Sequence, residues 1–147
     1  MKLRSAFYVV TFLCASLSPC FAHHMAVVVN KDNPVENVTA PHLAKILRAE
    51  IRKWPDGKAV VLVLHQDSVG ETETLQRLNR MSAAEWKTVL ATHKDTIIFV
   101  DTDADVLKAV QSMPGAIGLV EEHSLDSTIN VVKVDGKLPM ESGYLPH

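Results

Sequence analysis

The chain has 147 residues, a length that favours a single domain. Its 47% hydrophobic and 22% charged residues are typical of globular proteins and exclude a largely disordered chain. A formal net charge of −2 and an aromatic content of 5% give neither the basic surface nor the stacking platforms that nucleic-acid binding uses. We therefore expect no nucleic-acid partner.

The first 22 residues have the pattern of a signal peptide. A basic start at 1–4 precedes an apolar run from Ser5 to Leu17, which is shorter than the roughly 20 residues of a membrane-spanning helix. Cys20 and Ala22 then place small residues at the minus-three and minus-one positions of a cleavage site. We predict export to the periplasm with cleavage after Ala22; an uncleaved anchor is the alternative.

Cleavage there would leave residues 23–147 as one domain that lacks cysteine. Both cysteines, Cys14 and Cys20, precede the predicted cut. Such a domain contains no disulfide, no thiol nucleophile and no cysteine-based metal site.

Short β-rich runs alternate with helical patterns along the rest of the chain. In order, we predict a strand at 25–30, a helix at 40–50, a strand at 59–64, helices at 71–80 and from 82 onward, a strand at 96–100, a helix at 103–113, and strands at 116–120 and 129–134. Thr39 fits a helix N-cap, and Ser82 with Glu85 fits a capping box. The tail from Lys137 is expected to lie over the surface. The alternation predicts an α/β fold with a mostly parallel sheet flanked by helices.

The loops that follow three of these strands are the expected place for a ligand. In parallel sheets, ligands bind at the carboxyl ends of strands and at helix N-termini. We therefore single out the loops after Asn30, Leu64 and Val100.

Several short motifs occur in a characteristic order. They are Val27–Pro34, Leu43-x-x-Ile46-Leu47, Trp54–Lys58, Val60–His65, Met81-Ser-x-x-Glu85-Trp86 and Pro114–Gly118. Over about 26–136, this order resembles phosphate-type periplasmic solute-binding proteins of the type II periplasmic binding protein superfamily. Full-length members have two lobes, and this chain resembles a single lobe, the second. The resemblance implies non-covalent binding of phosphate or another small anion, a partnership with an ABC transporter in the membrane, no catalysis and no cofactor.

The resemblance places the anion site in the loop 65–72. Asp67 and Gly70 fit the family pattern, and the hydroxyls of Ser68 and Thr72 lie one residue out of register. Because Asn30 and Thr102 end neighbouring predicted segments, we expect them in the same crevice. These residue types also have local roles that would suffice. Asp67 or Ser68 can cap the helix, Asn30 can start a turn, and Thr102 or Asp103 can cap its own helix.

Three positions of this loop depart from the family pattern. His65 stands where the family has arginine, Val69 where it has serine, and Glu71 where it has threonine. A carboxylate at Glu71 is expected to repel an anion. A protonated His65 would attract one, which predicts tighter binding in mildly acidic solution.

Two alternatives from other classes remain open. After cleavage, His23 would become the N-terminal residue, and with His24 and Met25 it offers ligands for copper. A single lobe could also act as an interaction domain for another periplasmic protein. An enzyme is not predicted, because Ser68-Val-Gly lacks the frame of a nucleophile elbow and no acid, base and nucleophile come together. The segment 121–123 offers metal ligands, but a solvated turn accounts for it equally well.

Overall fold

A computed structural model describes residues 23–146 of the chain. The predicted signal peptide and its cleavage after Ala22 lie outside the described residues. The elements are β1 (Met25–Val29), β2 (Asn37–Val38), α1 (Ala40–Leu47), β3 (Val61–His65), α2 (Val69–Asn79), α3 (Ala83–His93), η1 (Lys94–Thr96), β4 (Ile97–Val100), α4 (Asp103–Ser112), β5 (Ala116–Glu121), η2 (Glu122–Ser124), β6 (Asn130–Val131) and β7 (Lys133–Val134). No helix within 23–146 has the length and apolarity to cross a membrane.

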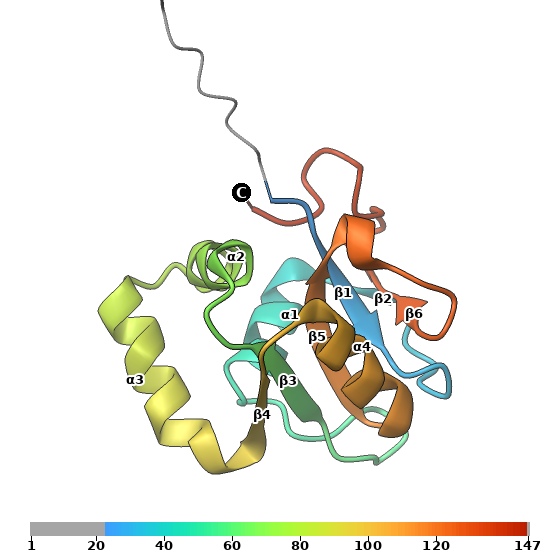
Figure 1. The fold of residues 1–147 in the computed structure, drawn as a ribbon, viewed down its shortest axis with the longest axis horizontal. Coiled ribbons are helices and arrows are strands. Elements are labelled where there is room, and N and C mark those ends of the chain that lie inside the picture. The colour runs from blue at the N-terminus through green and yellow to red at the C-terminus, as the bar shows by residue number, and fades with distance from the viewer. Residues whose placement is uncertain (1–22, 147) are drawn as a thin grey trace, which may run out of the picture.

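A five-stranded sheet of order β4-β3-β5-β1-β6 forms the centre of the molecule, with helices packed around it (Figure 1). Strand β3 pairs in parallel with both β4 and β5, whereas β1 is antiparallel to β5 and to β6. Four of the five strands therefore point in one direction, and β1 points in the other. This arrangement confirms the predicted α/β fold with a mostly parallel sheet.

The reversed β1 decides which ends of the strands meet. Met25 at its start lies opposite Glu121 at the end of β5, and Val29 lies opposite Ile117 near the start of β5. The ends of β3, β4 and β5 therefore share one side with the start of β1. We call this side the carboxyl edge. The other side, where β3 and β5 begin and β1 ends, is the amino edge.

Helices α1, α3 and α4 begin where the sequence predicts, and α2 begins two residues before the predicted start at 71. The side chain of Thr39 accepts a hydrogen bond from the His42 amide at the start of α1. At the start of α3, Ser82 and Glu85 each accept a hydrogen bond from the other's amide, at 3.2 Å and 2.7 Å, which confirms the capping box. These caps satisfy amides that the helices themselves leave unpaired.

Two hydrophobic clusters fill the space on the two faces of the sheet. Strand β1 is buried along its whole length and contributes Val27 and Val29 to one cluster and Val28 to the other. The first cluster contains side chains of α1, α2 and α3, and the second contains side chains of α4. Burial on both faces holds the carboxyl edge on a rigid base.

The C-terminal part of the described chain differs from the prediction. The expected strand at 129–134 divides into β6 and β7, and β7 pairs with β2 in a separate two-stranded sheet. The tail does not lie wholly on the surface, because Tyr144 and Leu145 are buried in the first cluster. The Tyr144 hydroxyl accepts from the Val27 amide at 3.1 Å and donates to the Val132 carbonyl at 2.6 Å.

Candidate functional site

The loop between β3 and α2 lies at the carboxyl edge, where the sequence placed the anion site. Strand β3 ends at His65, which is aligned with Val100 at the end of β4. Asp67 has a left-handed backbone with φ of 62°, a conformation that aspartate tolerates better than most residues. This bend turns the chain into α2, and its N-cap, Ser68, follows directly.

The first turn of α2 leaves two amides unpaired. The Ser68 side chain accepts from the Glu71 amide at 3.2 Å, and the Ser68 carbonyl accepts from the Thr72 amide at 3.0 Å. Among the described residues, the amides of Val69 and Gly70 have no acceptor. Unpaired amides at the positive end of a helix dipole favour a negative group.

The side chain of Glu71 is buried and contacts the backbone at the end of β3. Its side chain is 2% exposed, and both of its carboxyl oxygens accept from the His65 amide, at 3.1 Å and 3.2 Å. Burial raises the pKa of Glu71 to about 8, with a smaller increase from the Asp103 charge and an opposing effect from the His65 amide. Glu71 is therefore mostly uncharged at neutral pH. The expectation that it repels an anion as a carboxylate is wrong there, because burial keeps it protonated.

Asp103, the first residue of α4, joins three segments of the carboxyl edge. One carboxylate oxygen lies 2.9 Å from Nδ1 of His65, and the other accepts from the Glu121 amide and the Ser124 hydroxyl, both at 2.9 Å. A carboxylate only accepts, so this contact makes Nδ1 the protonated ring nitrogen of His65. In the neutral ring, Nε2 is then an acceptor, and it becomes a donor only when the ring is protonated.

The start of β1 brings a further histidine to the same place. The side chain of His23 covers Gly70 so closely that a Cβ added at Gly70 would lie 2.8 Å from the His23 Cβ. Nδ1 of His23 lies 3.1 Å from one oxygen of Glu121, and Nδ1 of His123 lies 3.2 Å from the other. Three imidazoles, from His23, His65 and His123, therefore gather at this edge.

The structure brings together most of the residues predicted for the site. They follow one another at the carboxyl edge: His65 ends β3, Asp67 and Ser68 form the loop, and Gly70 and Thr72 lie in the first turn of α2.

Thr102 lies at the same edge, at the start of α4, but its side chain accepts from the Asp105 amide and so serves as a helix cap. Ser68 also caps its helix. The local roles considered for both residues are therefore present in the structure.

The predicted place of Asn30 is wrong. Because β1 runs against β5, Asn30 lies at the amino edge, on the opposite side of the sheet from the loop 65–72. Its side-chain amide donates to the carbonyls of Val110 and Gln111 at the end of α4, and its oxygen accepts from the Asp32 amide. Asn30 therefore ends a helix and starts a turn.

Sequence reasoning missed the network that surrounds the loop. It considered His23 as a copper ligand, Asp103 as a helix cap, and Glu121 as part of a metal-binding segment or a solvated turn. A signal did exist, since each of these residues stands directly beside a predicted strand or helix end. Their meeting depends on the direction of β1, which local patterns do not determine.

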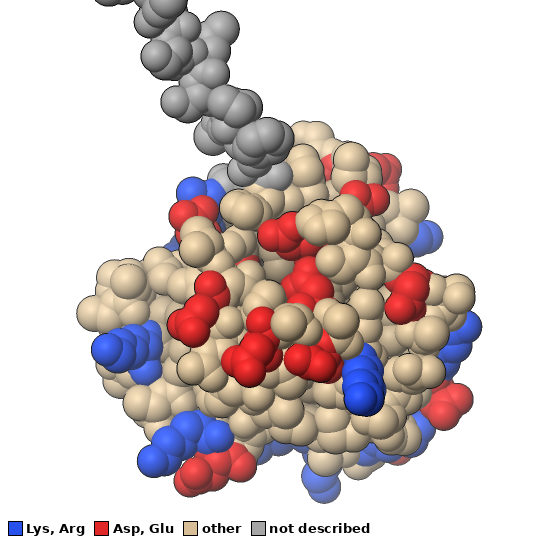
Figure 2. Space-filling model, viewed as in Figure 1, with Lys and Arg blue, Asp and Glu red and all other residues tan. Residues whose placement is uncertain are grey.

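The carboxyl edge is strongly acidic. The segments 65–73, 100–105 and 121–126 contain nine aspartates and glutamates and no lysine or arginine. Figure 2 shows acidic side chains gathered on the face where α2 and α4 meet, with basic side chains mainly nearer the rim. No group of three or more histidine, aspartate or glutamate side chains within 23–146 is arranged to hold a metal ion.

A family model described as a PBP superfamily domain matches residues 17–143, most of the chain. No curated protein matches in sequence.

Solved structures with the same fold include an ABC-type phosphate transport receptor from Vibrio cholerae, with 19% identity and a TM-score of 0.63 over 79% of this chain and 48% of that one. PstS from Borrelia burgdorferi has 19% identity and a TM-score of 0.61 over 79% of this chain and 49% of its own. A phosphate-binding protein from Stenotrophomonas maltophilia has 16% identity and a TM-score of 0.63 over 78% and 40%. The chain thus spans half or less of the length of these proteins.

Proposed function

Because the chain belongs to the PBP superfamily domain family, we propose that it is a solute-binding domain that holds phosphate or another small anion non-covalently in the β3–α2 loop. The two unpaired amides of Val69 and Gly70 carry this proposal, since they lie at the start of a helix at the carboxyl edge. The neutral state of Glu71 at neutral pH supports it, because an uncharged carboxyl does not oppose an anion.

His65 supplies the pH dependence of the proposed binding. Its Nδ1 is committed to Asp103, so Nε2 can donate to an anion only when the ring is protonated. The hydroxyls of Ser68 and Thr72 are further donors in the same loop. Protonation of the His65 ring would add this donor and a positive charge, so we expect tighter binding in mildly acidic solution.

The proposed site is described here by residues 23–146, and the chain spans half or less of the length of the phosphate-binding proteins whose fold it shares. Water reaches a site formed by these residues alone and competes for every donor in it. We expect a dissociation constant in the micromolar range or weaker, which corresponds to about −8 kcal/mol or less favourable.

The proposal also includes the cellular setting that the family and the leader pattern suggest. The chain is exported after cleavage behind Ala22, works in the periplasm, and delivers its solute to an ABC transporter. The family match supports these steps, and the sequence of residues 1–22 supports export.

Titration calorimetry with inorganic phosphate tests the binding step. The purified protein is measured at about pH 5.5 and about pH 7.5, and affinity is expected to be at least roughly tenfold higher at the lower pH. His65→Ala removes most of that difference. His42→Ala is the matched control, since His42 is exposed at the start of α1, far along the chain from the loop. Phosphate binding that is absent at both pH values contradicts the proposal.

A gain of affinity is a second test of the same site. His65→Arg restores the charged, bidentate donor that the family resemblance places at this position. It is expected to tighten phosphate binding and to reduce its pH dependence. Unchanged affinity would show that the loop does not contact the anion.

A second candidate function is an interaction domain that presents the carboxyl edge to a basic surface of another periplasmic protein. The observation that favours it is the excess of carboxylates in the segments 65–73, 100–105 and 121–126. A short oligolysine peptide is a suitable probe. Binding at low salt that disappears at high salt, without any phosphate binding, supports this candidate over the first.

A further inference from the structure

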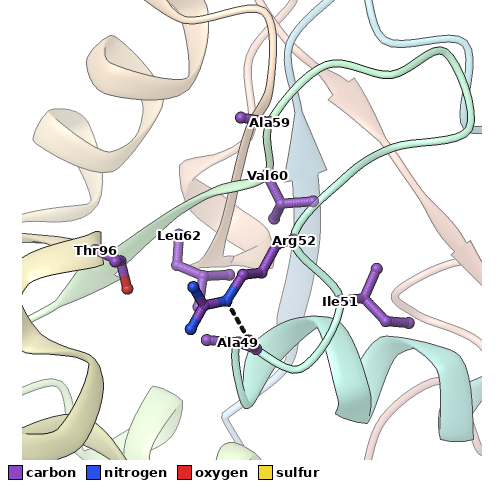
Figure 3. Close-up of a pocket in the computed structure, with 7 residues that line it drawn as sticks. All are labelled: Ala49, Ile51, Arg52, Ala59, Val60, Leu62 and Thr96. Carbon is purple, nitrogen blue, oxygen red and sulfur yellow. Dashed lines mark hydrogen bonds between the residues drawn. The ribbon is translucent and has the colours of Figure 1, made fainter.

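A small pocket opens at the amino edge, away from the loop 65–72. It has a volume of about 200 Å³ and is lined by residues after α1, by the start of β3 and by Thr96 before β4. Most of its wall is apolar and comes from alanine, valine, leucine and isoleucine side chains. Of the lining residues, Arg52 alone has a charged side chain (Figure 3).

The backbone around this pocket is held by hydrogen bonds. The Val60 amide donates to the Arg52 carbonyl at 2.9 Å, and Lys53 forms an antiparallel bridge with Ala59. On the opposite wall, Ala49 has a left-handed backbone with φ of 61° that ends α1. The walls are therefore preformed, and a ligand need not order them.

The side chain of Arg52 is exposed and lies along this apolar lining. Its Nε donates to the Ala49 carbonyl at 3.5 Å, and Figure 3 shows the group extending between Leu62 and Ala49 toward the side of Thr96. Among the described residues, no carboxylate pairs with Arg52. The nearby Glu50 is engaged with Arg48 at 2.9 Å instead.

The charge of Arg52 and the apolar walls indicate which kind of ligand the pocket could bind. A guanidinium that is not engaged with a carboxylate of the protein can recognise the carboxylate of a ligand through two parallel N–H donors, and apolar walls favour a hydrocarbon body. A water molecule occupies about 30 Å³, so the pocket holds roughly six or seven groups of that size. We propose that this pocket binds a small carboxylate with a short hydrocarbon chain, with Arg52 on the carboxylate and Leu62 and Val60 against the chain.

This site is independent of the proposed anion site at the carboxyl edge. It differs from that site in needing an apolar body on the ligand, and its charge comes from a permanently protonated arginine rather than from histidine. Binding here is therefore expected to change little between about pH 5.5 and about pH 7.5.

Ligand-detected and amide NMR with pentanoate tests the proposal on the purified protein. Pentanoate is expected to bind with a millimolar dissociation constant and to shift the amide signals of Ala49, Arg52 and Val60. Acetate keeps the charge without the chain, and 1-pentanol keeps the chain without the charge. Both are expected to bind at least roughly tenfold more weakly.

Variants connect the binding to the guanidinium. Arg52→Gln is expected to weaken pentanoate binding roughly tenfold or more, and Arg52→Lys to recover part of it, because lysine keeps the charge but loses the fork. Lys53→Gln is the matched control, one residue along the same exposed segment, and leaves binding unchanged. An unchanged melting temperature for Arg52→Gln shows that the fold is intact.

Three results would overturn the proposal: no pentanoate binding, equal binding by acetate or 1-pentanol, or equal binding by Arg52→Gln. Gly70→Asp separates the two sites, since it places a carboxylate in the loop 65–72. Loss of phosphate binding with retained pentanoate binding shows that the pocket works independently of the proposed function.

Discussion

At the carboxyl edge of the sheet, histidines and carboxylates are joined by hydrogen bonds, whereas at the amino edge apolar side chains leave a pocket beside the exposed side chain of Arg52. The first edge has nine acidic residues in three short segments, and its one fully buried acid, Glu71, keeps its proton. The second edge packs backbone against backbone, as at Gly115 and Ala59. The same sheet thus supports a titratable edge and a rigid apolar edge, and perturbations should affect them differently.

The largest difference should appear in the pH dependence of stability. In the unfolded chain Glu71 ionises near its usual pKa of 4.5, but in the folded chain its pKa is about 8. Between these values the folded state binds more protons, so the free energy of unfolding falls as pH rises. Glu71→Gln should remove this decline, on the order of 4 kcal/mol between about pH 5 and about pH 8.

Urea denaturation across that pH range measures the effect. Glu73→Gln is the control, since Glu73 is exposed on the same helix and has an ordinary partner in Arg77. A wild-type protein equally stable at both ends of the range would show that Glu71 ionises normally.

The stability of the amino edge should instead depend on the volume of the side chains introduced there. A Cβ added at Gly115 would lie 1.9 Å from the Ala59 carbonyl oxygen, and the Gly115 carbonyl already accepts from the indole of Trp54 at 2.9 Å. Gly115→Ala should therefore cost about 3 kcal/mol at any pH. Thermal unfolding at two pH values would check this. A loss of stability smaller than that of an exposed alanine substitution would show that the backbone at this edge moves to accommodate the Cβ.

Loss of the Asp103 carboxylate at the carboxyl edge should have the next largest effect on stability. Asp103→Ala leaves the Glu121 amide and the Ser124 hydroxyl without their acceptor, which should cost about 2 kcal/mol. It should also release the His65 ring, visible as a changed ring signal in a pH titration by NMR. Asp105→Ala, on the exposed side of the same helix, serves as the comparison. Equal losses for both variants would contradict this role of the Asp103 carboxylate.

The smallest effect should come from the cap of α2. Ser68→Ala removes the acceptor for the Glu71 amide and should lower stability by about 1 kcal/mol. Ser68→Asn retains a capping side chain and should lose less. If both variants are as stable as the wild type, the side chain of Ser68 does not stabilise α2.

Local patterns predicted what depends on neighbouring residues. The capping box of Ser82 and Glu85, the cap at Thr39 and the loop that begins at His65 all follow from short-range chemistry, and all are present. The direction of β1 was not predictable in this way. A strand buried on both faces has the composition of a parallel strand, although β1 pairs with its neighbours in the antiparallel sense.

In the candidate site, too, only the features that depend on neighbouring residues were predictable from the sequence. The position of Gly70 and Ser68 at a helix start follows from the loop itself, but Asn30 was misplaced because its edge depends on β1. The protonation of Glu71 depends on burial by segments distant in sequence, so its type alone suggested a charge that the fold removes.

The position of Tyr144 has a consequence for how the chain acquires its structure. Its hydroxyl bonds Val27 in the first strand of the sequence, and β1 also pairs with β5 and β6, which come more than 80 residues later. The hydrogen bonds of β1 are therefore complete only after the C-terminal part of the chain has been synthesised. A nascent chain halted before Tyr144 should remain open and protease-sensitive, because these distant contacts cannot yet form.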